Sequence, residues 1–352
     1  MSEVKDNHYV PRLYLRNFTD NPAHKNGKFD FLNLESQEHI GVIPHGSQMK
    51  ERYFYKKGTD IEKKLGDVFE GKHATIVKNI LDNQFVPDSA SLIEIVLLMH
   101  FRTRAQRDED LFFRKHMIDQ NIDVLVSSFK SSLKRDVPFL ANAMGDAVIE
   151  DMVRGGSYKK YLKKTDSAEK QIKNFERIKE EMAGLKSVIL NNTSSTNLIS
   201  SDRPVLLLNP FLNRKKVNFG KDGMFQMGIL LVLPISPTKI IICFDSNIYE
   251  NPFEISKREL SDQDVEKINK LQILCGVEGI YSKQLPKDIT EIVSAYLKEK
   301  KTPQLITVHL PDDYYLTYKE SNLPNFSFDF LKEKKEADTL RLRLPYPRPD
   351  SV

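Results

Sequence analysis

The residues of this chain that are best suited to chemistry are a histidine and three arginines. His8 and Arg12 lie in the segment NHYVPRLYLRNF, and Arg102 and Arg107 lie in a predicted helix further along the chain. Histidine is the common general acid or base near neutral pH, and the arginine side chain binds phosphate through paired N–H donors. This combination favours chemistry on a phosphate or another anion.

Four further polar residues complete the predicted site. Ser201 and Asp202 fall in a turn between two apolar runs, and functional side chains are often placed at such strand ends. We expect His8 and Asp202 to be catalytic, and Ser201 to donate a hydrogen bond to an anion held by Arg12, Arg102 and Arg107. Glu70 and Asn17 are expected to orient these groups.

Structural roles are equally favoured for several of these residues. Arg102 lies on the apolar face of its predicted helix, so it should be buried, with Asp202 or Glu70 as its partner. Such a pair could serve the fold alone, as could an Asx-type turn at Asp202 or a backbone-bonded His8. If His8, Arg102 and Asp202 share an open pocket, the site prediction holds, and if they are sealed from solvent it fails.

The sequence pattern predicts an α+β fold in one domain, residues 1–320, with three regions. A small β-rich region (7–57) has strands near 27–34, 38–44 and 51–57, and its Tyr9, Tyr14, Leu15 and Phe18 should pack inward. A helical block (60–183) and a mainly antiparallel sheet with helices (186–318) follow, and residues 321–352 form a charged extension that we expect to be loosely attached.

The helical block has the clearest boundaries. One helix runs from Asp60 to before Pro87, and a second runs from Leu92 to about Phe129. Asp88 and Ser89 offer caps for the second helix, and Ser91 with Glu94 resembles a capping box. Further helices are expected at 136–153, 166–183, 265–276 and 289–297.

Composition limits the classes of protein. The net charge of +4 comes from 53 basic and 49 acidic residues, so a nucleic-acid or nucleotide partner is possible but not required. Cys243 and Cys275 lie in apolar runs, which favours two thiols in a reducing compartment and a cytoplasmic location. No apolar run approaches the roughly 20 residues of a membrane span, so we expect no membrane partner.

Common cofactor motifs are absent from the sequence. It has no HExxH, CxxC pair, Walker loop or GxGxxG, which disfavours P-loop and Rossmann chemistry. Glu70 and Lys72 give an E-x-K pair, but a metal nuclease needs further convergent carboxylates. The sequence therefore predicts no metal site and requires no cofactor, although it does not exclude a divalent metal.

Five stretches together resemble an uncharacterised family, domain of unknown function 4238. They are His8–Arg12 with Tyr14–Phe18, Phe69–Lys72, Phe101–Thr103 with Arg107, Ile199–Val205 and Leu233–Pro237. The resemblance spans about residues 7 to 284, with Arg104 standing where the family often has proline. It implies a shared fold and shared positions, and no reaction.

The residues favour an enzyme directed at phosphodiesters or nucleotides, such as a nuclease-like effector. The alternative is a non-enzymatic module, in which the same residues form a buried polar network and the chain binds a ligand or a protein partner. The sequence determines neither whether the chain is an enzyme nor its oligomeric state.

Overall fold

The computed structural model describes residues 6–55, 71–83, 87–161, 164–217, 223–300, 305–309, 315–319, 323–324 and 326–339. The helices are α1 (Arg12–Arg16), η1 (His45–Ser47), α3 (Ala74–Leu81), α4 (Ser89–Phe101), α5 (Arg104–Asp136), α6 (Pro138–Tyr161), α7 (Lys164–Glu181), α8 (Pro210–Arg214), α9 (Pro252–Ser256), α10 (Asp262–Cys275), α11 (Ile289–Glu299) and η4 (Lys335–Thr339). The strands are β1 (Asp6–His8), β2 (Lys28–Asn33), β3 (Glu38–Pro44), β4 (Lys50–Arg52), β5 (Lys186–Asn192), β6 (Ser200–Ser201), β7 (Leu206–Leu208), β8 (Leu230–Ser236), β9 (Lys239–Phe244), β10 (Glu259–Leu260), β11 (Gly279–Ser282), β12 (Leu305–His309) and β13 (Tyr315–Lys319). The fold is α+β, as predicted.

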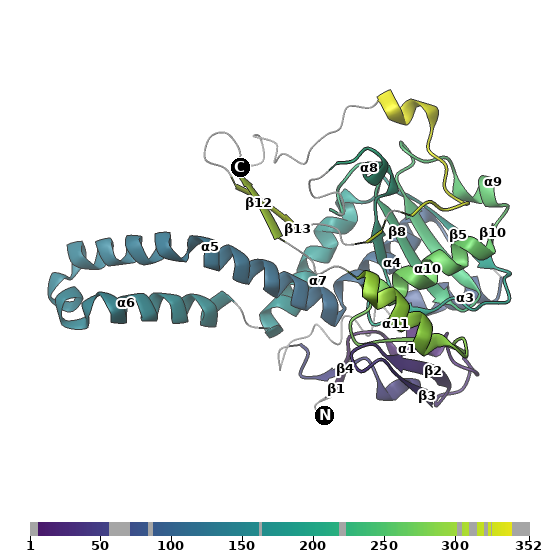
Figure 1. Ribbon diagram of the computed structural model, residues 1–352, viewed down its shortest axis with the longest axis horizontal. Helices are drawn as coiled ribbons and strands as arrows, with labels where there is room; N and C mark the ends of the chain where they lie inside the picture. Colours follow the sequence, from purple (N-terminus) through teal and green to yellow (C-terminus); the bar gives the residue numbers. More distant parts are fainter. Residues whose placement is uncertain are drawn as a thin grey trace.

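The main sheet has the order β10-β5-β9-β8-β7, and all its pairs are antiparallel except β10 with β5. Its central strands β8 and β9 are buried at every position because both faces are covered. Leu231 and Leu233 of β8 face a core that includes α4 and α7, whereas Leu230 and Val232 face the core that includes α10. Figure 1 shows the sheet with α10 in front of it.

A second, four-stranded sheet has the order β3-β2-β11-β6 and joins distant parts of the chain. Its strand β11 pairs with both β2 and β6, so that Tyr281 lies opposite Phe31 on one side and Ser200 on the other. The N-terminal β region is therefore completed by strands from the C-terminal region. The third strand of this region is shorter than the predicted range of 51–57. It is β4, which covers only Lys50–Arg52 and pairs with β1.

The long helix predicted from Leu92 to about Phe129 is in fact two helices. The first, α4, is capped by Asp88, whose Oδ1 accepts from the Ser91 backbone N–H at 2.7 Å, in place of the predicted capping box. The helix then breaks at Thr103, whose extended backbone and Oγ1 cap the N-terminus of α5. This break changes the direction of the chain between Arg102 and Arg107.

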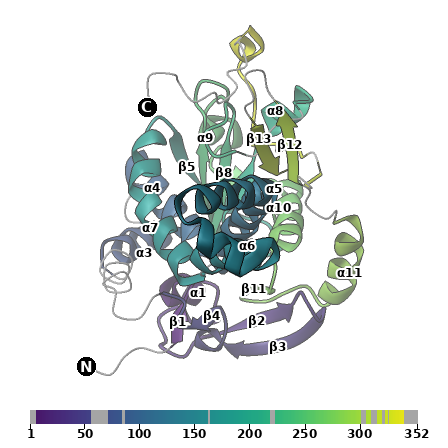
Figure 2. The ribbon, with the colours of Figure 1, turned by 90° about the vertical axis from the view of Figure 1, so that its left-hand side faces the viewer.

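Beyond the break, α5 and α6 form a helical hairpin that projects from the body (Figure 1; end-on in Figure 2). Several large apolar side chains on it are exposed, with Phe139 the most exposed at 84%. The α6 helix contains a kink at Gly145, which has a φ of 73°. Within the described parts of the chain, no helix is both long and apolar enough to span a bilayer.

Two further sequence expectations concern the C-terminal region and the thiols. Residues 326–339 differ from the loosely attached extension that their composition predicts, because Phe328 and Phe330 are buried in the same core as α10. The apolar side chains outweigh the charged ones in placing this segment. Cys243 and Cys275 form no disulfide with each other, and the first is buried and the second half-buried.

Candidate functional site

The N-terminal motif is anchored in the core. Its Tyr9, Tyr14, Leu15 and Phe18 are all buried, as predicted. The Tyr14 hydroxyl lies 2.5 Å from the Pro234 carbonyl oxygen, to which it donates, and 2.8 Å from Ser200 Oγ. These contacts tie α1 to the main sheet and fix the direction of the polar side chains on its other face.

Arg102 connects the helical block to this motif. Its side chain is buried, as predicted, and its Nη2 donates to the backbone carbonyl of His8 at 2.7 Å. Of the two predicted carboxylate partners, Asp202 is engaged elsewhere and Glu70 lies outside the described residues. Arg102 thus holds the backbone of His8 in place.

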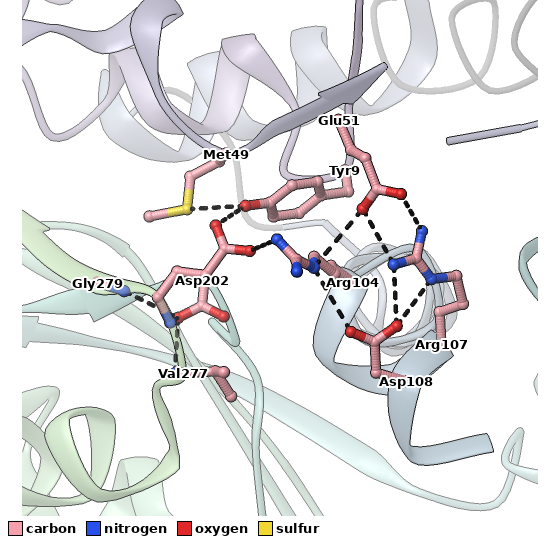
Figure 3. A network of polar contacts seen from close by, with 10 residues as sticks. Tyr9, Met49, Glu51, Arg104, Arg107, Asp108, Asp202, Val277 and Gly279 are labelled. Atoms are coloured by element: carbon pink, nitrogen blue, oxygen red, sulfur yellow. Dashed lines mark hydrogen bonds and ion pairs between the residues drawn. The ribbon is translucent and has the colours of Figure 1, made fainter. Parts of the chain in front are cut away.

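Asp202 and Ser201 are both buried and bonded within the protein. Asp202 Oδ1 accepts from the backbone N–H groups of Val277, Glu278 and Gly279 at 2.9, 3.0 and 3.3 Å (Figure 3). Burial raises the pKa of Asp202 against the lowering effect of these donors. Ser201 Oγ lies 2.7 Å from Gln272 Oε1 and donates to it. The two residues close the turn between α10 and β11, and they are sealed from solvent.

Arg107 is fully buried in an ion pair. Its Nη1 and Nη2 donate to the two carboxylate oxygens of Glu51 at 2.9 and 3.0 Å, and its Nε donates to Asp108 at 2.9 Å. The guanidinium also lies over the ring of Phe54, 4.6 Å from its centre. All three guanidinium nitrogens contact a carboxylate and the side chain is fully buried, so Arg107 is closed to a ligand.

Arg104 extends this network, and the sequence analysis assigned it no role. It lies 2.5 Å from Glu278, 3.5 Å from Asp108 and 3.6 Å from Glu51, and Tyr9 donates its hydroxyl hydrogen to Glu278 (Figure 3). The one sequence signal for this role of Arg104 was its spacing from Asp108, because side chains four residues apart on a helix lie next to each other. The network joins α5 to β4 and β11.

A second group of basic side chains lies where α1 packs against η1. We call His8, Arg12, Arg16 and His45 the cationic cluster; of these, His45 was not predicted as a site residue. Arg12 and Arg16 are one helical turn apart, and Arg12 lies against Gly46, where an added Cβ would be 3.0 Å from Arg12 Nη2. In the part of the chain that the structure describes, neither arginine has a carboxylate partner.

The electrostatic potential at the cationic cluster is positive, as the pKa values of its two histidines show. Burial lowers the pKa of His8 to about 4, and Arg12, Lys50 and Arg102 lower it further against a hydrogen bond to Gly46. Burial and the charges of Arg12 and Arg16 also lower the pKa of His45. No described carboxylate opposes these shifts, so both rings are neutral at pH 7 in a positive field.

Three buried nitrogen atoms at this place have no hydrogen-bond partner among the described residues: Arg16 Nε, Asn17 Nδ2 and His45 Nε2. His45 is 99% buried, and its Nδ1 donates to the Gly27 carbonyl at 2.8 Å. Buried polar atoms are rarely left unbonded, so these three are suited to a further ligand or to water.

No group of three or more metal-ligating side chains converges within the described ranges. No curated protein and no solved structure matches the chain. A family model does match: that of a protein of unknown function, DUF4238, which covers residues 6–284. The signature segments at His8–Phe18, Phe101–Arg107 and Ile199–Val205 all lie within this match and meet in the contacts described above. The chain therefore belongs to the DUF4238 family.

Proposed function

We propose that this protein binds the phosphate group of a nucleotide or a nucleic acid at the cationic cluster, and that His8 serves there as the acid–base group of a phosphodiester-directed enzyme. The observation that carries the proposal is the pair Arg12 and Arg16. Both lie on the same side of α1 and both lack a described carboxylate partner. Guanidinium groups left without counter-charges beside a neutral histidine favour an anionic ligand.

The two histidines are in the protonation state that a base needs. His8 Nε2 lies 3.3 Å from the Gly46 carbonyl oxygen, and His45 Nδ1 lies 2.8 Å from that of Gly27. A carbonyl oxygen only accepts, so these nitrogens carry the hydrogens and the opposite nitrogens keep a lone pair. A bound anion would raise the pKa of both rings and make them better bases.

The proposed site is smaller than the one predicted from the sequence. Asp202, Ser201 and Arg107 are left out because each is buried and bonded within the protein. For these three residues the structural network fits better, so the non-enzymatic module remains the second candidate. It differs from the first only in whether bound ligand is turned over. Two cysteines that form no disulfide fit a reducing cytoplasmic setting, which belongs to the proposal.

Binding is tested by titrating the full chain with inorganic phosphate, AMP and a short single-stranded RNA in a calorimeter. We expect Arg12→Gln and Arg16→Gln each to weaken AMP binding by about tenfold, the usual size of a lost charge-assisted contact. Arg135→Gln is the matched control, because Arg135 is exposed at the end of α5. Equal affinity in all four proteins would overturn the proposal.

Catalysis is tested separately on the same preparations. RNA, DNA and nucleotides are incubated with the wild-type protein and with His8→Gln, with and without Mg²⁺. We expect turnover in the wild type and its loss in the variant, while AMP affinity in the variant stays measurable. Binding without turnover in the wild type would select the non-enzymatic module.

A further inference from the structure

A second candidate site lies beside the α4–α5 break and is lined by none of the residues of the cationic cluster. A cleft of about 240 Å³ opens there, and we call it the α4–α5 cleft. Its polar lining residues are His100, Gln106, Glu109 and Arg203, and Phe101 and Phe225 contribute aromatic rings. None of these residues was predicted as a site residue from the sequence.

His100 is the least explained group in the cleft. The side chain is 96% buried, and its Nδ1 has no hydrogen-bond partner within the described residues. Burial lowers the pKa of His100 to about 4, with Arg203 acting in the same direction and Glu109 against it. The ring is therefore neutral at pH 7 and offers one donor and one acceptor.

The cleft as a whole has no net charge. Arg203 Nη2 donates to Glu109 Oε2 at 2.5 Å, so these opposite charges cancel beside the neutral His100. A free anion gains little here, in contrast to the cationic cluster. A ligand that offers both donors and acceptors along one edge is the better match.

The aromatic residues define the shape of such a ligand. Phe101 packs edge-on against His100, with ring centres 5.1 Å apart, and fixes the orientation of the imidazole. Phe225 is 50% exposed, so much of its side chain is accessible to a ligand. The cleft is smaller than the roughly 300–1,000 Å³ of drug-sized pockets, which limits the ligand to about one ring system.

We propose that the α4–α5 cleft binds an uncharged heteroaromatic ring of the nucleobase class, stacked on Phe225 and hydrogen-bonded to His100 and Arg203. Nucleobases are flat, uncharged and edged with donors and acceptors, and their rings stack on exposed aromatic side chains. The proposal is independent of the phosphate proposal, because it concerns a different set of residues and ligands that carry no phosphate.

The test uses adenosine, guanosine, cytidine and uridine, which carry no phosphate, and the full chain labelled with ¹⁵N-histidine. We expect at least one nucleoside to bind at millimolar concentration or below and to shift the His100 resonances. Phe225→Ala should weaken binding about tenfold. Phe139→Ala should not, because Phe139 is exposed on the α5–α6 hairpin.

His100→Gln tests the hydrogen bond between His100 and the edge of the ligand. His100 is buried, and if this variant does not fold, the comparison of the wild type with Phe225→Ala still decides the test. The proposal is overturned if none of the four nucleosides binds, or if binding is equal in the wild type and Phe225→Ala. It is also overturned if indole, which has far fewer hydrogen-bonding groups, binds more tightly than every nucleoside. None of these outcomes bears on phosphate binding at Arg12 and Arg16.

Discussion

Arg102 donates a hydrogen bond to the backbone carbonyl of His8, 94 positions earlier in the chain, at 2.7 Å. A side chain at the end of α4 thereby sets the position of the first described strand. The same strand carries the histidine of the proposed phosphate site. Positioning of the site and stability of the fold are coupled through this contact.

Arg102→Ala should therefore affect both properties. Loss of the guanidinium leaves the His8 carbonyl without this donor and opens space in a buried region, so the free energy of unfolding should fall by about 2–4 kcal/mol. Urea denaturation measures this change. Folded Arg102→Ala should also bind AMP more weakly than the wild type. A variant as stable as the wild type would show that the contact is unimportant.

Arg107→Leu should destabilise the protein without changing the proposed site. It removes the residue that donates to both carboxylate oxygens of the partly exposed Glu51 and leaves only the longer contact with Arg104, so we expect a loss of about 2–3 kcal/mol. Arg135→Leu at the exposed end of α5 should change stability by less than about 0.5 kcal/mol. If Arg107→Leu were instead stable and unable to bind AMP, Arg107 would be a ligand-binding residue.

Asp202→Asn separates a structural role from a catalytic one. The amide keeps one oxygen for the three backbone N–H groups but loses the negative charge, so stability should fall by about 1–3 kcal/mol. AMP affinity and any turnover per folded molecule should be unchanged. A stable variant that has lost turnover would return Asp202 to the catalytic site.

Stability should fall in mild acid because of His100. Its folded pKa of about 4 lies below the usual value near 6.5, so the unfolded chain takes up the proton first as the pH falls. The contribution of the neutral His100 to the free energy of unfolding is fully present above pH 6.5 and is lost as the pH falls from about 6.5 to 4. We expect roughly 2 kcal/mol of loss from this residue between pH 7 and pH 5. His100→Gln should show a shallower decline in urea denaturation, and an identical decline would contradict the prediction.

Anion binding should take up protons. A bound anion opposes the lowering of the His45 pKa by burial and by Arg12 and Arg16, so the complex binds protons more readily than the free protein. Affinity should therefore rise as the pH falls from 8 to 6. Sulfate is the appropriate probe because its own charge is constant over this range. His45→Gln should reduce the slope, and a pH-independent affinity in the wild type would argue against the cluster.

The local features of the fold could be predicted from the sequence. The inward packing of Tyr9 and Phe18, the strands at 28–33 and 38–44, and the burial of Arg102 follow from apolar spacing and turn residues, which act over a few positions. The family also follows from short signatures in a fixed order, and the match to residues 6–284 confirms it.

The break at Thr103 shows where local reasoning failed. The periodicity continues across it, and only the Thr103 cap and the packing on each side end α4 there. A single helical periodicity therefore does not relate Arg102 to Arg107, because the two residues lie on either side of the break. After the break, Arg107 turns inward to Glu51 and Phe54.

The sequence by itself determined which residue types could bind an anion and which segments carry them. Tertiary structure alone decided which of those residues have partners, because that depends on contacts between residues far apart in the chain. Asp202 meets Val277, and Arg107 meets Glu51, so their polar groups are bonded within the protein. Arg12 and Arg16 meet no described carboxylate, and their charge remains available to a ligand.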